Sequence, residues 1–150
     1  MRLAAAAFVF FVLVVEACGG GQASPTPSPG GSPLAQASGK IGAEVPMPVG
    51  FPADVPIYTK ARLTQAAGFP TAAPTSWGME WQTVDAVAKV QAFYTDKLNQ
   101  GDWSLTVNST ANGEFKATFK RKSNSGVFGT LAVNSTSGVT KILMSLVTPS

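Results

Sequence analysis

The sequence predicts an α+β domain, with one helix packed on a five- or six-stranded, mainly antiparallel sheet, preceded by a signal peptide and a disordered linker. Three observations lead to this fold class. Apolar residues recur at helical spacing in one stretch only, between residues 84 and 100. Apolar and polar residues alternate in the stretches around it, as they do in half-buried strands. Turn residues separate the stretches after the helix, so successive strands are expected to pair antiparallel and to bury one face under the helix.

The first residues of the chain have the layout of a signal peptide. Arg2 supplies a positive charge, and an unbroken apolar run from Leu3 to Val15 follows it. The run is shorter than the about 20 residues that a transmembrane helix needs. We therefore interpret residues 1–17 as an export signal that is removed, and not as a permanent anchor.

The end of this run carries a resemblance to a known class. The segment Val15-Glu16-Ala17-Cys18 resembles the lipobox of bacterial lipoproteins. The resemblance implies that a diacylglyceryl group is attached to the Cys18 thiol and that cleavage occurs after Ala17. Glu16 departs from the small or apolar residue usual at its position, which bears on the efficiency of processing. Ordinary signal cleavage is the alternative, and it would leave Cys18 as a free thiol.

We expect a lipid-anchored protein of the cell membrane that faces outside the cytoplasm, with the membrane as its partner through Cys18. Residues 18–45 are the predicted linker. Gly, Pro, Ser and Thr dominate it up to about Gly39, and such a composition does not bury a core. As a flexible coil, the linker reaches roughly 25 Å from the membrane.

The folded domain is expected to span residues 46–150 and to open with an extended arm. Prolines 48, 52 and 56 favour extended backbone and exclude helix. A short strand over 61–67 and a loop over 68–75 follow. We expect three apolar residues to hold the arm on the core, namely Phe51, Val55 and Ile57.

The next predicted strand contains two of the three tryptophans. Trp77, Met79 and Trp81 alternate with polar or small residues, which is the pattern of a strand with one buried face. Together with Trp103, these tryptophans suggest a carbohydrate platform as one hypothesis. Their alternation favours the core, because aromatic side chains supply much of the buried area of small domains.

The helix is predicted from Val84 to Gln100. Thr83 is a suitable N-cap, and Gly101 suits the left-handed position that closes a helix. Asp85 stands in the first turn, where the helix dipole favours an anion, and can pair with Lys89 one turn later. The apolar face consists of Val87, Val90, Phe93, Tyr94 and Leu98.

Four strands are predicted after the helix, joined as a meander by turns at 111–113, 123–126 and 135–138. Regular alternation marks the first two, whereas the last two are apolar on both parities. The face that these last two turn inward is therefore left open by the sequence. The strands are expected over residues 103–108, 114–120, 127–134 and 139–147.

A second resemblance covers most of the chain after the linker. The segments Phe51-Pro-Ala-Asp-Val-Pro-Ile-Tyr58, Glu80-Trp-Gln-Thr83, Phe93-Tyr94 with Leu98, and Gly101-Asp-Trp103 resemble the tethered domains of uncharacterised lipoproteins of actinobacteria and related bacteria, the FPxDVPxY type. The resemblance implies the same fold and brings no activity with it.

The composition excludes several kinds of site. The chain has no histidine, which is the commonest metal ligand and the usual proton carrier near neutral pH. The net charge of +3 is too small to indicate nucleic acid. Phosphate-loop and nucleophile-elbow motifs are missing from the sequence. We expect no cofactor, no metal and no nucleic-acid partner, and we take the domain to be a monomer.

Two sets of charged residues are candidates for function. The basic residues of one predicted strand and its turn form a candidate patch for anionic lipid or wall polymer, with charged protection of a strand edge as the alternative; they are Lys116, Lys120, Arg121 and Lys122. A carboxylate pair for hydrolysis would have to come from Asp54, Glu80, Asp85, Asp96, Asp102 and Glu114.

The sequence thus favours a noncatalytic binding or envelope-interaction module over an enzyme. An alternative hypothesis is a carrier of lipid or of another small hydrophobic ligand, in which the helix stands off the sheet and leaves an apolar cavity. A carboxylate-dependent hydrolase is the third hypothesis.

Overall fold

A computed structural model describes residues 39–69 and 74–149 of the chain. The predicted signal peptide, the lipidation site Cys18 and most of the linker lie outside the described residues. The chain is divided into two units, residues 1–34 and residues 35–150, and all described residues belong to the second. All described buried apolar residues belong to the second unit, which therefore carries its own hydrophobic core and meets the physical requirement for folding alone.

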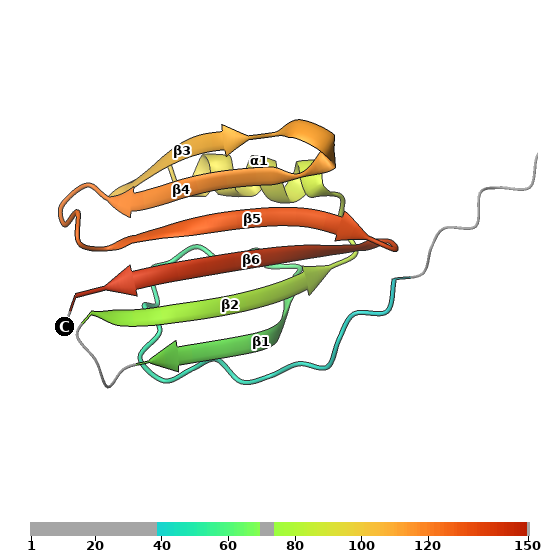
Figure 1. The fold of residues 1–150 in the computed structure, drawn as a ribbon, viewed down its shortest axis with the longest axis horizontal. Helices are drawn as coiled ribbons and strands as arrows, with labels where there is room; N and C mark the ends of the chain where they lie inside the picture. The colour runs from blue at the N-terminus through green and yellow to red at the C-terminus, as the bar shows by residue number, and fades with distance from the viewer. Residues whose placement is uncertain (1–38, 70–73, 150) are drawn as a thin grey trace, which may run out of the picture. The chain divides into compact units, whose positions relative to one another are not determined.

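The second unit is an α+β fold, as predicted, with one helix on a six-stranded antiparallel sheet. The strand order is β1-β2-β6-β5-β4-β3, and Figure 1 shows the sheet face-on with helix α1 behind it. The chain crosses from β2 to the far edge strand β3 by way of the helix, and hairpin turns then join β3, β4, β5 and β6 in order. The elements are β1 (Arg62–Phe69), β2 (Thr75–Thr83), α1 (Val87–Lys97), β3 (Trp103–Ser109), the 3₁₀ turn η1 (Ala111–Gly113), β4 (Phe115–Arg121), β5 (Phe128–Thr136) and β6 (Val139–Thr148).

Two segments, the helix and the arm, cover the inner face of the sheet. The helix lies behind the β3–β4 side, and the arm that precedes β1 passes behind the β6–β2–β1 side (Figure 1). Val55 of the arm is buried, and Phe51 and Ile57 pack partly buried against the core, which confirms the predicted role of these three side chains. Hydrogen bonds from this region to the strands begin at Gly42, whose N–H donates to Gln82 Oε1, earlier than the expected domain start at residue 46.

The helix is shorter than the sequence predicts. Ala86 has extended backbone (ψ 148°), so the helix starts at Val87 and not at Val84. Thr83 does not cap it, because its hydroxyl accepts the N–H of Asp85 within a turn before the helix. Gly101 does adopt the left-handed conformation, with φ 56°. The predicted ion pair between Asp85 and Lys89 is present, with Nζ and Oδ1 3.3 Å apart.

Register decides the inward faces of the last two strands, which the sequence left open. The odd positions Leu131 and Val133 of β5 and the even positions Ile142 and Met144 of β6 are buried. Gly129 is also inward, because a Cβ there would lie 2.2 Å from the carbonyl oxygen of Ser145.

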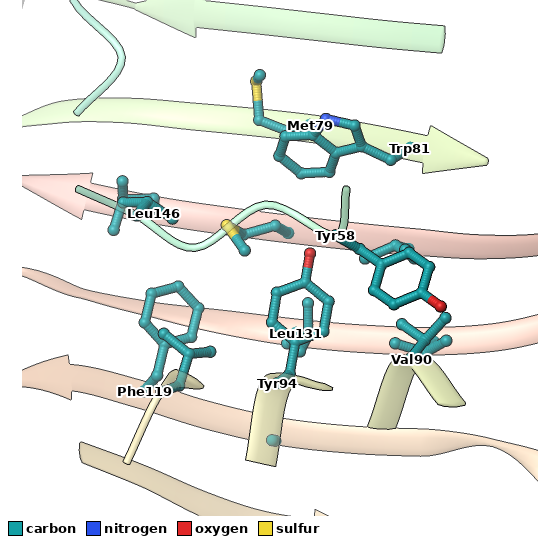
Figure 2. Close-up of a cluster of buried hydrophobic side chains, with 14 of the residues drawn as sticks. Tyr58, Met79, Trp81, Val90, Tyr94, Phe119, Leu131 and Leu146 are labelled. Carbon is teal, nitrogen blue, oxygen red and sulfur yellow. The ribbon is translucent and has the colours of Figure 1, made fainter. Parts of the chain in front are cut away.

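Side chains fill the space between the helix and the sheet. Figure 2 shows Tyr94 projecting from the helix into a cluster that includes Trp81 and Leu131. The Tyr94 hydroxyl lies near the backbone of Tyr58 but finds no hydrogen bond of ordinary geometry within the described residues. Burial raises the pKa of this phenol. All three tryptophans belong to the core, and Trp81 is only 1% exposed, so they form no exposed platform.

Candidate ligand-binding site

The outer face of the sheet, opposite the helix and the arm, carries an unbroken row of small side chains. The register aligns one outward residue from each of the six strands. With neighbouring strands about 4.8 Å apart, the row is about 24 Å long from edge to edge. In order across the sheet it consists of Thr106, Thr118, Thr130, Ser145, Gly78 and Ala67.

Two hollows lie along this row. One has a volume of about 410 Å³ over β1, β2, β6 and β5, and the other has about 360 Å³ over β3, β4 and β5. Both are lined by Thr130, which makes them neighbours. A Cβ built on Gly78 would meet nothing within 4 Å, so the space above this residue is open. We call the row and its two hollows the outer channel.

Larger side chains border the outer channel on both sides. Phe128 and Phe69 belong to one flanking row and are 49% and 64% exposed. Leu143 belongs to the other and is 40% exposed. These three apolar side chains stand on β5, β1 and β6 and mark the border of the channel at separate places. The outer channel suits an elongated ligand, because it crosses all six strands of the sheet.

Glu80 is the one acidic side chain that lines the larger hollow, and its carboxylate is already engaged. Its Oε1 accepts hydrogen bonds from Gln82 Nε2 at 2.7 Å and from Thr64 Oγ1 at 3.4 Å. Lys141 Nζ lies 4.0 Å from the same oxygen. The carboxylate therefore links side chains of β1, β2 and β6.

Four hollows stand out in the described part of the chain, and none of these four lies between the helix and the sheet, where the carrier hypothesis placed an apolar cavity. Two of them lie along the outer channel. A third lies between the arm and β1, and the fourth lies on the exposed side of the helix. The inner face instead buries Tyr94, Leu98 and Phe115 completely.

The structure separates the four basic residues of the candidate patch. Lys116 and Lys120 project from the outer face, and Lys116 pairs with Glu114 at 2.7 Å. Lys122 Nζ donates to the carbonyl of Gly101 at 2.8 Å. Arg121 lies on the opposite face. Only Lys120 borders the outer channel.

Arg121 connects the arm to the sheet. Its guanidinium forms ion pairs with Asp54 of the arm and with Asp102, and its carbon Cζ lies 4.7 Å from the centre of the Trp103 ring. Hydrogen bonds from the side chain and backbone of Ser123, followed by the nearby Arg121, hold the pKa of Asp102 below its usual range. Asp54 and Asp102 thus share one arginine as their ion-pair partner.

The remaining candidate carboxylates have structural partners. Hydrogen bonds from Tyr58 and Lys89 lower the pKa of Asp85. Asp96 accepts a hydrogen bond from Gln100, and Glu114 pairs with Lys116.

Within residues 39–69 and 74–149, no three acidic or cysteine side chains gather in a way that could hold a metal ion. No helix in that part of the chain is both long and apolar enough to span a membrane.

The outer channel was missed in the sequence interpretation. Its residues alternate with buried ones, so they looked like an ordinary polar face. A signal existed in the outward positions Thr106, Thr118 and Thr130, which are uniformly small and uncharged. Only the register could show that they align with Ser145 and Gly78, which lie on strands far apart in the sequence.

Comparison with known proteins gives one match. A family model described as START domain-like matches residues 64–128, a segment that holds most of β1, all of β2, α1, β3 and β4, and the first residue of β5. Searches of curated proteins and of solved structures return no match. The chain is therefore similar to START domain-like proteins in the segment where its helix and four of its strands are formed.

Proposed function

We propose that this protein is a noncatalytic ligand-binding module, tethered outside the cytoplasm through a lipid on Cys18, that binds a single apolar chain in the outer channel. The observation that carries the proposal is the row of six small residues with two adjoining hollows. The similarity to START domain-like proteins supports a ligand-binding role over a catalytic one. The signal sequence and lipobox support the tether.

The dimensions of the outer channel fit one acyl chain. The hydrocarbon core of a bilayer is about 30 Å thick, so an extended acyl chain from one leaflet is about 15 Å long. The row of about 24 Å accommodates such a chain and leaves room for a headgroup. Hollows of about 410 and 360 Å³ fall in the range of small-molecule sites. A tether that keeps the domain near a membrane also keeps it near a supply of lipids.

The test is a titration of the unit 35–150 with lysophosphatidylcholine below its critical micelle concentration, followed by amide NMR. We expect saturable binding, with shifts concentrated on Thr118, Thr130, Ser145 and Gly78. Gly78→Val places a side chain in open space above the row and should abolish binding without unfolding the domain. Ala92→Val, on the exposed side of the helix, is the matched control and should bind as the wild type does.

Either of two results would overturn this proposal. One is the absence of saturable binding by the folded wild-type unit. The other is binding that persists in Gly78→Val with shifts on Tyr94 and Leu98, because the ligand would then lie between the helix and the sheet.

A further inference from the structure

The two ends of the outer channel differ in chemistry. Over β1, β2 and β6 the lining is mostly apolar or small and contains no cation; its polar members are Gln65, Ser145 and Glu80, and the Glu80 carboxylate already has three partners. Over β3 and β4 the lining includes, beside Phe119, three hydroxyl-bearing side chains and one cation, namely Ser104, Thr106, Thr118 and Lys120. An amphiphile with an apolar tail and an anionic head matches this polarity in one direction only, because the reverse orientation would place the anion beside Glu80.

Lys120 differs from the other three basic residues of its strand and turn. Lys116 pairs with Glu114, Arg121 with Asp54 and Asp102, and Lys122 donates to a backbone carbonyl. Within the described residues, Lys120 makes neither an ion pair nor a side-chain hydrogen bond. It is opposite Ser104 on β3 and Phe128 on β5, at the rim of the smaller hollow. Its ammonium group is thus the one positive charge free to meet a ligand at this end.

Resting on the proposed function, we propose that the ligand is a single-chain membrane lipid with a monoanionic phosphate headgroup. Lys120 and the hydroxyls of Thr106 and Thr118 bind the headgroup, and the acyl chain extends toward Ala67. A phosphate offers several acceptor oxygens to these donors, and lysine binds phosphate as a point charge. The volumes of the two hollows match one chain better than two.

The experiment compares two lipids with the same acyl chain, lysophosphatidylglycerol and lysophosphatidylcholine, titrated into the unit 35–150 by calorimetry. The first lipid has a net negative head and the second a zwitterionic one. We expect the wild type to prefer lysophosphatidylglycerol by about fivefold, which is the contribution of one basic residue near an anionic group. High salt should reduce this preference, because the site is open to solvent.

Two variants test whether Lys120 causes the preference for lysophosphatidylglycerol. Lys120→Gln should lose the preference and bind the two lipids with equal affinity. Lys116→Gln removes the same charge from the same face of the same strand, but from a lysine already paired with Glu114, so it should keep the preference. Equal binding of both lipids by the wild type would overturn this inference while leaving the proposed function intact. An effect of Lys116→Gln as large as that of Lys120→Gln would also overturn it. Failure of the wild type to bind either lipid would overturn the proposed function itself.

Discussion

The guanidinium of Arg121 stacks on the ring of Trp103, with Cζ 4.7 Å from the ring centre, while it bridges Asp54 and Asp102. This contact joins the arm to the β3–β4 edge of the sheet. The Trp103 indole N–H also donates to the carbonyl of Asp54 at 3.3 Å. The stacked pair is therefore the point at which the arm is fastened over the core.

Replacement of Arg121 tests this fastening. Arg121→Lys keeps the charge but loses the planar stack and the two-sided fork, so we expect the free energy of unfolding to fall by about 1 kcal/mol. Urea denaturation followed by tryptophan fluorescence measures the change. Lys116→Gln, which disrupts only an exposed ion pair, is the control and should change stability little. A stability of Arg121→Lys equal to that of the wild type would show that the stack contributes nothing.

Tyr94 provides a test of the polar group buried in the core. Its hydroxyl has no well-formed hydrogen bond within the described residues, so Tyr94→Phe should leave stability unchanged or raise it by up to about 1 kcal/mol. Leu131→Ala, a cavity-forming change in the same cluster, should cost about 2–5 kcal/mol. Thermal and urea unfolding of both variants make the comparison. A large loss in Tyr94→Phe would mean that the hydroxyl is bonded in solution.

Two strand glycines should respond oppositely to alanine. A Cβ on Gly129 would lie 2.2 Å from the Ser145 carbonyl oxygen and 2.5 Å from the Phe119 ring, so Gly129→Ala should destabilise the sheet by roughly 1–3 kcal/mol. Gly78 has open space around the same position, and Gly78→Ala should be neutral or slightly stabilising. The melting temperatures of the two variants measure the difference. An equal decrease in both would contradict the placement of Gly129 on the inner face and Gly78 on the outer face of the sheet.

Asp102 gives the domain a defined sensitivity to acid. Its folded pKa lies below the unfolded value of about 3.9, so the ionised carboxylate stabilises the fold above that pH. This stabilisation is lost as the pH falls through the folded pKa. Asp102→Asn should lower stability at pH 7 and weaken the decline below about pH 4, as urea midpoints across pH 3–7 would record. An unchanged pH profile would exclude Asp102 as a source of the acid sensitivity.

The tether is tested in cells that express the full chain. Radioactive palmitate should label the wild type and not Cys18→Ser, because the thiol is the proposed site of the diacylglyceryl group. Membrane fractions should retain the wild type in processed form. A processed Cys18→Ser protein that still remains with the membranes would show that another feature anchors it.

Local pattern was enough to predict most of the secondary structure. The alternation of Trp77, Met79 and Trp81 predicted β2 and its buried face, and the structure confirms both. Both predicted helix ends were wrong by three residues; at the start, the hydroxyl of Thr83 bonds within the preceding turn and does not cap the helix. End positions depend on single hydrogen bonds, which periodicity does not contain.

By itself, the sequence determined the fold class, the strands, the inner-face anchors of the arm and the signal that predicts a tether, because periodicity and motif chemistry are properties of neighbouring residues. Only the tertiary structure decided which residues align in the row from Thr106 on β3 to Ala67 on β1. It also decided that Arg121 is engaged in ion pairs, whereas Lys120 lines a hollow of the outer channel. These relationships depend on strand register and on the crossover through the helix. They join residues far apart in the chain, so no local pattern contains them.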